Sequence, residues 1–207
     1  MGRVIGSLWL FVLIFLSGFA LMGFEMLGSR YLNPYFGSGI TTWACLIAVV
    51  LFAMMVGYTA GGIVADRSRE IWIVSTVLST VGVYLILVAF LANRVMEAIM
   101  LSAGYDFWGT MVASVALTFL PVAFLAALSP FFVRLLLKEL EYGGRITGAV
   151  YGVSTMGNVL GTLVTVFVFI PNVGTSKITV VFGGVLIACG VASFVLSRSR
   201  AVRNVQI

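Results

Sequence analysis

Six long apolar runs constrain this chain more than any other feature of its sequence. A helix that crosses a membrane needs about 20 consecutive, mostly apolar residues. The predicted helices cover residues 5–28, 41–65, 71–92, 108–137, 146–170 and 178–197. Only 9% of the residues are charged, whereas a soluble domain typically has about 25%. The sequence therefore predicts an all-α integral membrane protein, in which residues 1–207 form one polytopic domain of six transmembrane helices.

The lysines and arginines between the runs predict how the helices are oriented. Positive residues concentrate in the cytoplasmic connections of membrane proteins. Six spans place both termini on one side, and that side collects every lysine and arginine except Arg30, Arg94 and Lys177. We therefore expect cytoplasmic termini. The net charge of +5 follows from this bias, so it does not indicate a nucleic-acid partner.

Glu25 is an ionisable residue near the end of the first run. A charge in the bilayer core costs roughly 3 kcal/mol, so such a residue is a functional-site hypothesis by default. Gly18, Met22, Glu25 and Ser29 are separated by steps of four, three and four residues, and we expect their shared face to point into the bundle. Two interpretations stay open. Glu25 binds a proton, cation or solute, or it forms a structural ion pair with Arg30 just beyond the predicted helix end.

The segment after Glu25 is expected to leave the membrane and return. The chain is predicted to break at Asn33–Pro34 and to re-enter apolar sequence after Gly37 and Gly39. Trp43 then begins the second helix on the same side of the membrane as Glu25. It is either a residue of the interfacial aromatic belt or part of a binding surface.

A polar stripe runs along the fifth predicted helix. Its members fall within a sector of about 80° at 100° per residue: Thr147, Tyr151, Ser154, Asn158, Thr162 and Thr165. Glycine pairs flank the stripe on both sides, Gly148 with Gly152 and Gly157 with Gly161. Both spacings allow neighbouring helices to approach closely. The stripe either lines a polar cavity or makes hydrogen bonds between helices. The predicted solute or ion site comprises Glu25, Arg30, Trp43, Tyr151, Ser154, Asn158 and Thr162.

The connection after the second helix carries a charged motif, GGIVADRSR. It lacks the G-x-G-x-x-G spacing of a nucleotide-binding loop. Through Gly62, Asp66, Arg67 and Arg69 it resembles the G-x-x-x-D-R-x-x-R signature of the major facilitator superfamily. That resemblance implies a cytoplasmic gate in which Asp66 and Arg67 pair with charges such as Arg134 and Arg145. The alternative is a charged loop that simply obeys the topology rule.

Several segments in order extend the resemblance over most of the chain. They read FEMLGSRYLNPYFGSGITTW, GYTAGGIVADRS, SPFFVRL and GAVYGVSTMGNVLGTLVTVFVFIPNVGT. Together they are similar to the membrane part of the bacterial fused MFS/spermidine synthase family. The resemblance implies half of a major facilitator bundle in a bacterial inner (plasma) membrane. Such a half can rebuild a complete transporter as a parallel homodimer. These residues contain no spermidine-synthase-like domain, so we expect no enzyme activity.

Two functions remain as hypotheses. The first is a half-size transporter of a small polar or cationic solute, with a polyamine as one candidate. The second is a membrane anchor or scaffold for a soluble synthase-like partner. The chain has no His, and Cys45 and Cys189 have no metal-ligand spacing, so we expect neither a metal nor a cofactor.

Overall fold

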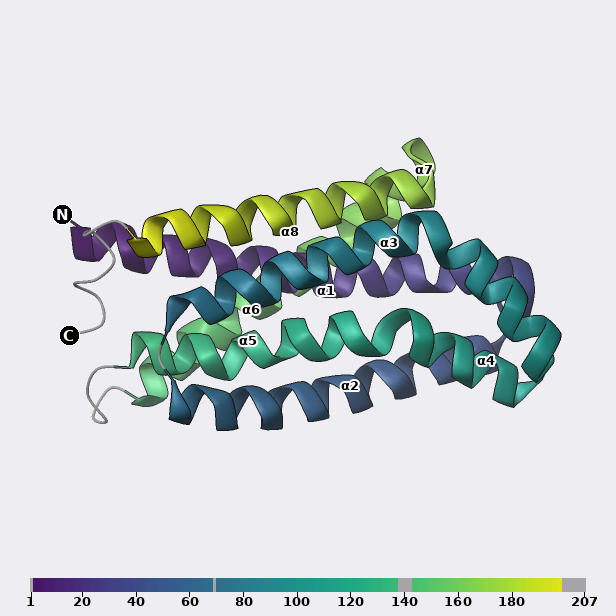
Figure 1. Ribbon diagram of the computed structural model, residues 1–207, viewed down its shortest axis with the longest axis horizontal. Coiled ribbons are helices and arrows are strands. Elements are labelled where there is room, and N and C mark those ends of the chain that lie inside the picture. The colour runs from purple at the N-terminus through teal and green to yellow at the C-terminus, as the bar shows by residue number, and fades with distance from the viewer. Residues whose placement is uncertain (1, 69, 138–142, 199–207) are drawn as a thin grey trace.

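The computed structural model describes residues 2–68, 70–137 and 143–198. Within these ranges it contains helices and turns and no strand. The helices long and apolar enough to cross a membrane are Gly6–Phe36, Ile40–Arg67, Ile71–Ala103, Phe107–Leu136, Gly143–Asn172 and Thr175–Ser197. They confirm the predicted all-α, six-span fold, and we refer to them as spans 1 to 6. The spans lie side by side in one elongated bundle (Figure 1).

Four spans are single α-helices: α1 (Gly2–Phe36), α2 (Ile40–Arg67), α3 (Ile71–Ala103) and α8 (Thr175–Arg198). Span 4 consists of α4 (Phe107–Ser114), the π-helical turn η1 (Val115–Phe119) and α5 (Leu120–Leu136). Span 5 consists of α6 (Gly143–Val164), the π-helical turn η3 (Thr165–Phe169) and α7 (Ile170–Asn172). We call the end of the bundle where α1 begins and α8 ends the terminal end, and the opposite end the distal end (Figure 1).

Both π-helical turns end two residues before a proline. Pro121 follows η1, and Pro171 follows η3. A proline inside a helix removes one N–H donor and crowds the carbonyl four residues earlier. A wider π turn accommodates that loss without breaking the span. In span 4 the proline at position 121 is thus accommodated by a local π turn.

The spans pack in three pairs. Span 3 lies against span 6, span 1 against span 5, and span 2 against span 4. If spans 1, 2 and 3 are exchanged with spans 4, 5 and 6 in the same order, the same three pairs result. Spans 1 and 4 run in opposite directions, so the relation is that of an inverted repeat, an arrangement found in transporter folds.

Glycines bring the backbones together at matching places in this repeat. Side chains at Gly57 and Gly61 of α2 would collide with the carbonyl oxygens of Ala123 and Ala127 in span 4. A side chain at Gly161 of α6 would likewise collide with a carbonyl of α1. Each pair therefore depends on small residues for its close approach.

Two predicted helix ends were wrong. The first helix does not break at Asn33–Pro34 but continues to Phe36. It stops at Gly37, whose φ of 75° and N–H bond to the Asn33 carbonyl terminate it. The third helix does not end near residue 92 but continues to Ala103. Residues 93–103 belong to α3, and Met96, which is only 1% exposed, continues the buried stripe of this helix.

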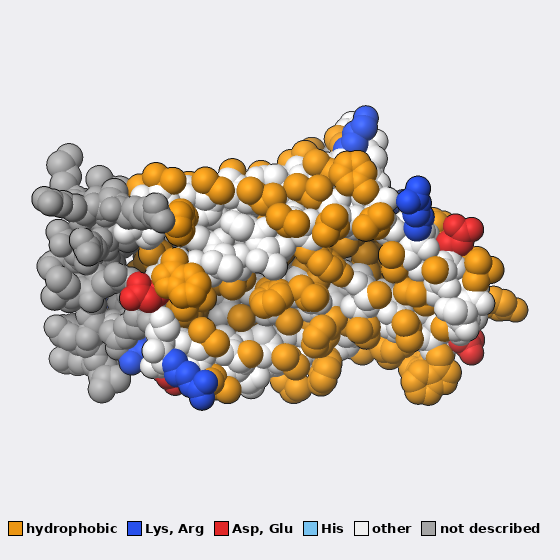
Figure 2. All heavy atoms as spheres, viewed as in Figure 1, with side chains coloured by type: hydrophobic (Ala, Val, Ile, Leu, Met, Phe, Trp, Pro, Cys, Tyr) orange, Lys and Arg blue, Asp and Glu red, His pale blue; other side chains and the backbone are white. Residues whose placement is uncertain are grey.

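Burial is uneven among the spans. In the most apolar segment of span 1, 61% of the residues are buried, whereas the figure for span 5 is 17%. Apolar side chains cover the middle of the visible surface, and charged side chains lie towards its two ends (Figure 2). Span 1 is thus central, and span 5 is the most peripheral.

Candidate functional site

Glu25 is buried in the bundle without a partner. Its side chain belongs to α1, only 8% of the residue is exposed, and it makes no hydrogen bond or ion pair with any described residue. A buried polar group without a partner is costly. The structure therefore agrees with the expectation that Glu25 points inward.

Its neighbours on α1 define what Glu25 faces. One turn towards the distal end, a side chain at Gly28 would lie 3.3 Å from the Thr118 methyl group of η1. One turn towards the terminal end, Met22 packs against a cluster that includes Val122 of α5. Residues three apart share a helix face. Glu25 thus lies opposite the interval between Thr118 and Val122, where span 4 changes from a π turn to an α-helix.

Arg30 does not pair with Glu25. No nitrogen of Arg30 lies within 4 Å of a carboxylate oxygen of Glu25, and Arg30 is exposed. Five residues along a helix correspond to about 140° around its axis, so the two side chains point in different directions. The proposed structural ion pair was wrong, because α1 continues as a regular helix past Arg30.

The polar stripe of α6 only partly faces α1. The Asn158 side-chain oxygen is sealed from solvent without a hydrogen bond, and a side chain at Gly18 would lie 2.9 Å from it. The Ser154 carbonyl also meets Gly18. The Thr162 hydroxyl instead donates to its own helix, to the Asn158 carbonyl at 3.0 Å. Ser154 and Asn158 therefore meet the helix face that carries Glu25, about two turns nearer the terminal end.

The remaining stripe residues lie elsewhere. Tyr151 is 39% exposed and makes an edge contact with the Tyr58 ring of α2, with centroids 6.5 Å apart. The Thr165 hydroxyl is sealed without a partner and lies near Gly23, which points away from the face of Glu25. The stripe does not enclose one cavity together with Glu25.

The two glycine pairs of α6 behave differently. Side chains at Gly157 and Gly161 would collide with carbonyl oxygens of Phe15 and Phe19 in α1, as the predicted close approach requires. Nothing lies within 4 Å of the corresponding positions at Gly148 and Gly152. The prediction of tight packing on both flanks was therefore wrong for the first pair within this chain.

Trp43 lies in the first turn of α2 at the distal end and is 36% exposed. Its neighbours Thr42 and Leu46 are buried instead. The Thr42 hydroxyl donates to the Phe36 carbonyl at 3.2 Å and so ties α2 to the end of α1. The position of Trp43 suits an interfacial aromatic residue better than a wall of the buried site.

One predicted gate contact is present at the terminal end. The Arg134 Nε lies 3.9 Å from an Asp66 carboxylate oxygen, which links α5 to α2. Asp66 has an 81% exposed side chain, so solvent weakens this pair. Arg67 and Arg145 are exposed, and neither has a carboxylate within 4 Å among the described residues. Arg69 lies outside the described residues.

Sequence reasoning missed a row of buried hydroxyls in span 4. Thr110, Ser114 and Thr118 follow each other at intervals of four residues and are at most 2% exposed. Each hydroxyl donates to the carbonyl four residues earlier at 2.8 Å. The spacing of four was the available signal. It was overlooked because hydroxyls in an apolar run change its hydropathy little.

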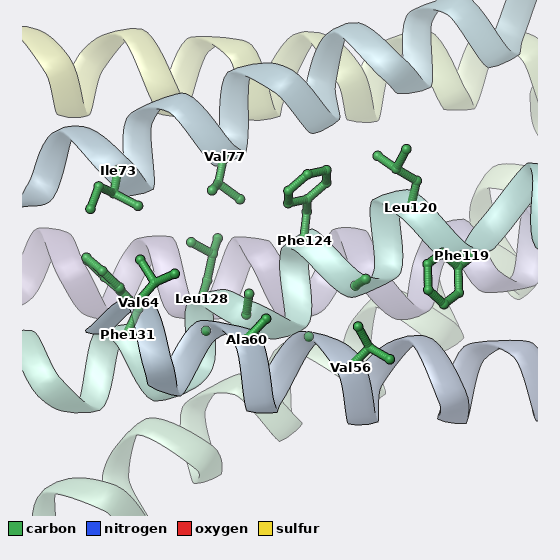
Figure 3. A pocket seen from close by; sticks show the side chains of 14 residues that line it. Val56, Ala60, Val64, Ile73, Val77, Phe119, Leu120, Phe124, Leu128 and Phe131 are labelled. Carbon is green, nitrogen blue, oxygen red and sulfur yellow. The ribbon is translucent and has the colours of Figure 1, made fainter. Parts of the chain in front are cut away.

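The grooves described here are apolar. One groove of about 360 Å³ lies between α2, α3 and α5 and is lined by residues such as Val56, Val77 and Phe124 (Figure 3). Two further openings along spans 2 to 4, of about 420 and 210 Å³, are also apolar. Neither Glu25 nor any residue of α6 lines these three grooves. A polar solute site is therefore not preformed in them.

Comparison of the chain with protein-family models, curated proteins and solved structures finds no match.

Proposed function

We propose that this chain is a half-size, facilitator-like transporter of a small polar or cationic solute and that Glu25 binds the coupling ion or the solute. The observation that carries the proposal is the burial of Glu25 without an ion pair or hydrogen bond. An intramembrane carboxylate costs roughly 3 kcal/mol and marks an ion or substrate pathway by default. A structural role would require a partner, and the predicted partner Arg30 is exposed.

The fold supports the same proposal. The inverted relation between spans 1–3 and spans 4–6 is the arrangement within each half of a major facilitator transporter. A π turn in span 4 faces Glu25, and such turns often occur at functional sites. The contact between Asp66 and Arg134 lies at the terminal end, where the proposed cytoplasmic gate would be.

A second copy supplies the missing half. Span 5 is the least buried span, and its Gly148 and Gly152 meet nothing within this chain. Small-xxx-small spacings of this kind support helix association in membranes. In a parallel homodimer the solute path would run between the two copies, so the lack of a polar cavity within one copy is expected. The charge bias supports cytoplasmic termini for this dimer, and a bacterial inner membrane is the location that we propose for it.

Flux into proteoliposomes tests the proposal directly. The full chain is reconstituted and challenged with labelled polyamines, monoamines and neutral polar solutes. We expect uptake of at least one cationic solute, and Glu25→Gln should abolish it while the protein remains folded. Arg30→Gln is the matched control and should retain uptake. Equal uptake by wild type and Glu25→Gln contradicts the role given to Glu25.

The alternative is a membrane anchor for a soluble synthase-like partner. The observation that favours it is the apolar character of the three grooves, which offer a polar solute no site. Exposed Arg67 and Arg145 would then contact the partner. Co-purification of a synthase-like protein, lost in Arg67→Glu with Arg145→Glu, together with no flux of any solute, would establish this function instead.

A further inference from the structure

The groove of about 360 Å³ between α2, α3 and α5 owes its shape to small residues (Figure 3). Gly57, Ala60 and Gly61 of α2 line it together with Ala123 and Ala127 of α5. The two glycines allow α2 to lie directly against the backbone of α5, whereas α3 packs mainly on α8. The space between α2 and α3 therefore stays open above residues that have little side chain to fill it.

This groove opens towards the membrane and has the length of one leaflet. Val64, Leu120 and Phe124 line it and are 42%, 40% and 39% exposed. All of its lining residues are apolar or glycine, so water finds no polar partners there and hydrocarbon chains fill it in a bilayer. Phe119 and Phe131, at the two ends of the lining segment of α5, are separated by about 18 Å along the helix. Half of the hydrocarbon thickness of a bilayer is about 15 Å, so the groove accommodates one acyl chain.

Two arginines lie at the terminal opening of this groove. Arg67 follows the lining residue Val64 by three positions in α2, and Arg134 follows the lining residue Phe131 by three positions in α5. Residues three apart share a helix face, and each Cα–Cβ bond tilts towards the N-terminus of its helix. Both helices end at the terminal end (Figure 1). The two side chains therefore start beyond the groove and are directed back towards its opening.

Neither guanidinium group is saturated by the described residues. The Arg134 Nε is sealed from solvent and makes no hydrogen bond, because the Asp66 carboxylate is 3.9 Å away. Arg67 is exposed and has no described carboxylate within 4 Å. A phosphate group accepts paired hydrogen bonds from guanidinium groups. The opening of the groove thus offers a phosphate the donors that Asp66 leaves unused.

The charge of the terminal end favours an anionic ligand. Its described acidic residues are Asp66 and Glu70, whereas its described basic residues are Arg3, Arg67, Arg134, Arg145 and Arg198. Clusters of basic residues at a membrane surface attract anionic lipids. A lipid that carries both an acyl chain and a phosphate matches the apolar groove and the charges at its opening together.

We propose that the groove binds an anionic glycerophospholipid, with one acyl chain between α2 and α3 and with its phosphate between Arg67 and Arg134. The bound lipid would bridge α2 and α3 at the terminal end. Neither Glu25 nor any residue of α6 lines this groove, so the assignment does not depend on the proposed transport.

Lipid retention by the full chain tests the assignment. The protein is extracted in the presence of equal amounts of phosphatidylglycerol, phosphatidylcholine and diacylglycerol with identical acyl chains, and native mass spectrometry identifies the lipids that stay bound. We expect one phosphatidylglycerol per chain. Retention should be about tenfold weaker when Arg67→Gln and Arg134→Gln are combined, because charge-assisted hydrogen bonds to the phosphate are lost. Arg145→Gln is the matched control, since Arg145 is an exposed arginine of α6 outside the groove, and it should retain the lipid.

Ala60→Leu tests the groove separately from the charges. Its larger side chain would occupy the acyl-chain position while both arginines remain, so the retention of phosphatidylglycerol should fall. Ala48→Leu is the control, because Ala48 is an exposed residue of the same helix that lines a different groove. Equal retention of the three lipids by wild type, or wild-type retention in Ala60→Leu, overturns the assignment. A wild type that retains no lipid, together with a changed assembly state in Ala60→Leu, would assign the groove to a second copy instead.

Discussion

Gly82 and Gly183 approach each other reciprocally. A side chain at Gly82 of α3 would lie 2.6 Å from the Gly183 carbonyl oxygen, and one at Gly183 of α8 would lie 2.6 Å from the Gly82 carbonyl oxygen. The next nearest groups are also equivalent, Ile187 in one case and Ile86 in the other. Spans 3 and 6 exchange with each other in the inverted repeat, so this contact marks its axis.

Gly183→Ala should destabilise the bundle because its methyl group forces the two backbones apart. Overpacking of this kind costs about 1–3 kcal/mol. Gly184→Ala is a close control, since nothing lies within 4 Å of that position. Alanine favours a helix over glycine by about 1 kcal/mol, so Gly184→Ala should be neutral or stabilising. Thermal unfolding in detergent measures both, and equal losses would contradict the reciprocal contact.

Tyr84→Phe should loosen the π turn of span 4. The change removes the hydrogen bond to the Ala116 carbonyl, and one such bond contributes about 1 kcal/mol. Amide hydrogen exchange should increase within Val115–Phe119 more than in the rest of α5. Uniform exchange along span 4 in wild type and variant would argue against a supporting role for Tyr84.

Asp66→Asn should change stability very little. The ion pair with Arg134 is exposed on the Asp66 side and 3.9 Å long, and such pairs contribute less than about 1 kcal/mol. If the pair serves as a gate, the variant should instead alter solute flux, and high salt should reproduce the effect in wild type. A large fall in unfolding temperature without a change in flux would identify a structural pair.

Gly152→Leu should weaken the proposed dimer and leave the fold of each copy intact. The side chain enters open space within one copy, but it would obstruct a second helix at the same place. Size-exclusion chromatography with light scattering reports the assembly state. Gly161→Leu is the contrasting variant, because its side chain collides with the Phe19 carbonyl of α1 and should unfold the chain. A dimer that survives Gly152→Leu would place the interface elsewhere.

The sequence was sufficient for the number and nature of the spans, because apolar length is a local property. It was insufficient for their partners. The two glycine pairs of α6 have the same spacing, yet Gly157 meets Phe15 while Gly148 meets nothing. The two pairs differ because span 1 lies against the side of α6 that carries Gly157 and not against the side that carries Gly148.

Some errors had a signal that was missed. The separation of five between Glu25 and Arg30 already opposes an ion pair on a continuous helix. The spacing of Val88, Ala92 and Met96 continues the buried face of α3 past the polar Asn93 and Arg94. The hydroxyl row of span 4 was equally visible at its regular interval. In the first two cases local polarity was given more weight than periodicity.

The pairing of the spans also determines the order in which the protein can assemble. Span 1 packs mainly on α6, and span 3 packs mainly on α8. Neither span can therefore complete its packing until a helix that is synthesised much later has been made. Chains generally acquire structure from the N-terminus as they are made. Here, however, span 1 lacks its close contact with α6 until Gly157 and Gly161 enter the membrane. Truncation after span 4 would leave two of the three pairs incomplete, and we expect such a fragment to be recognised and degraded by membrane quality control.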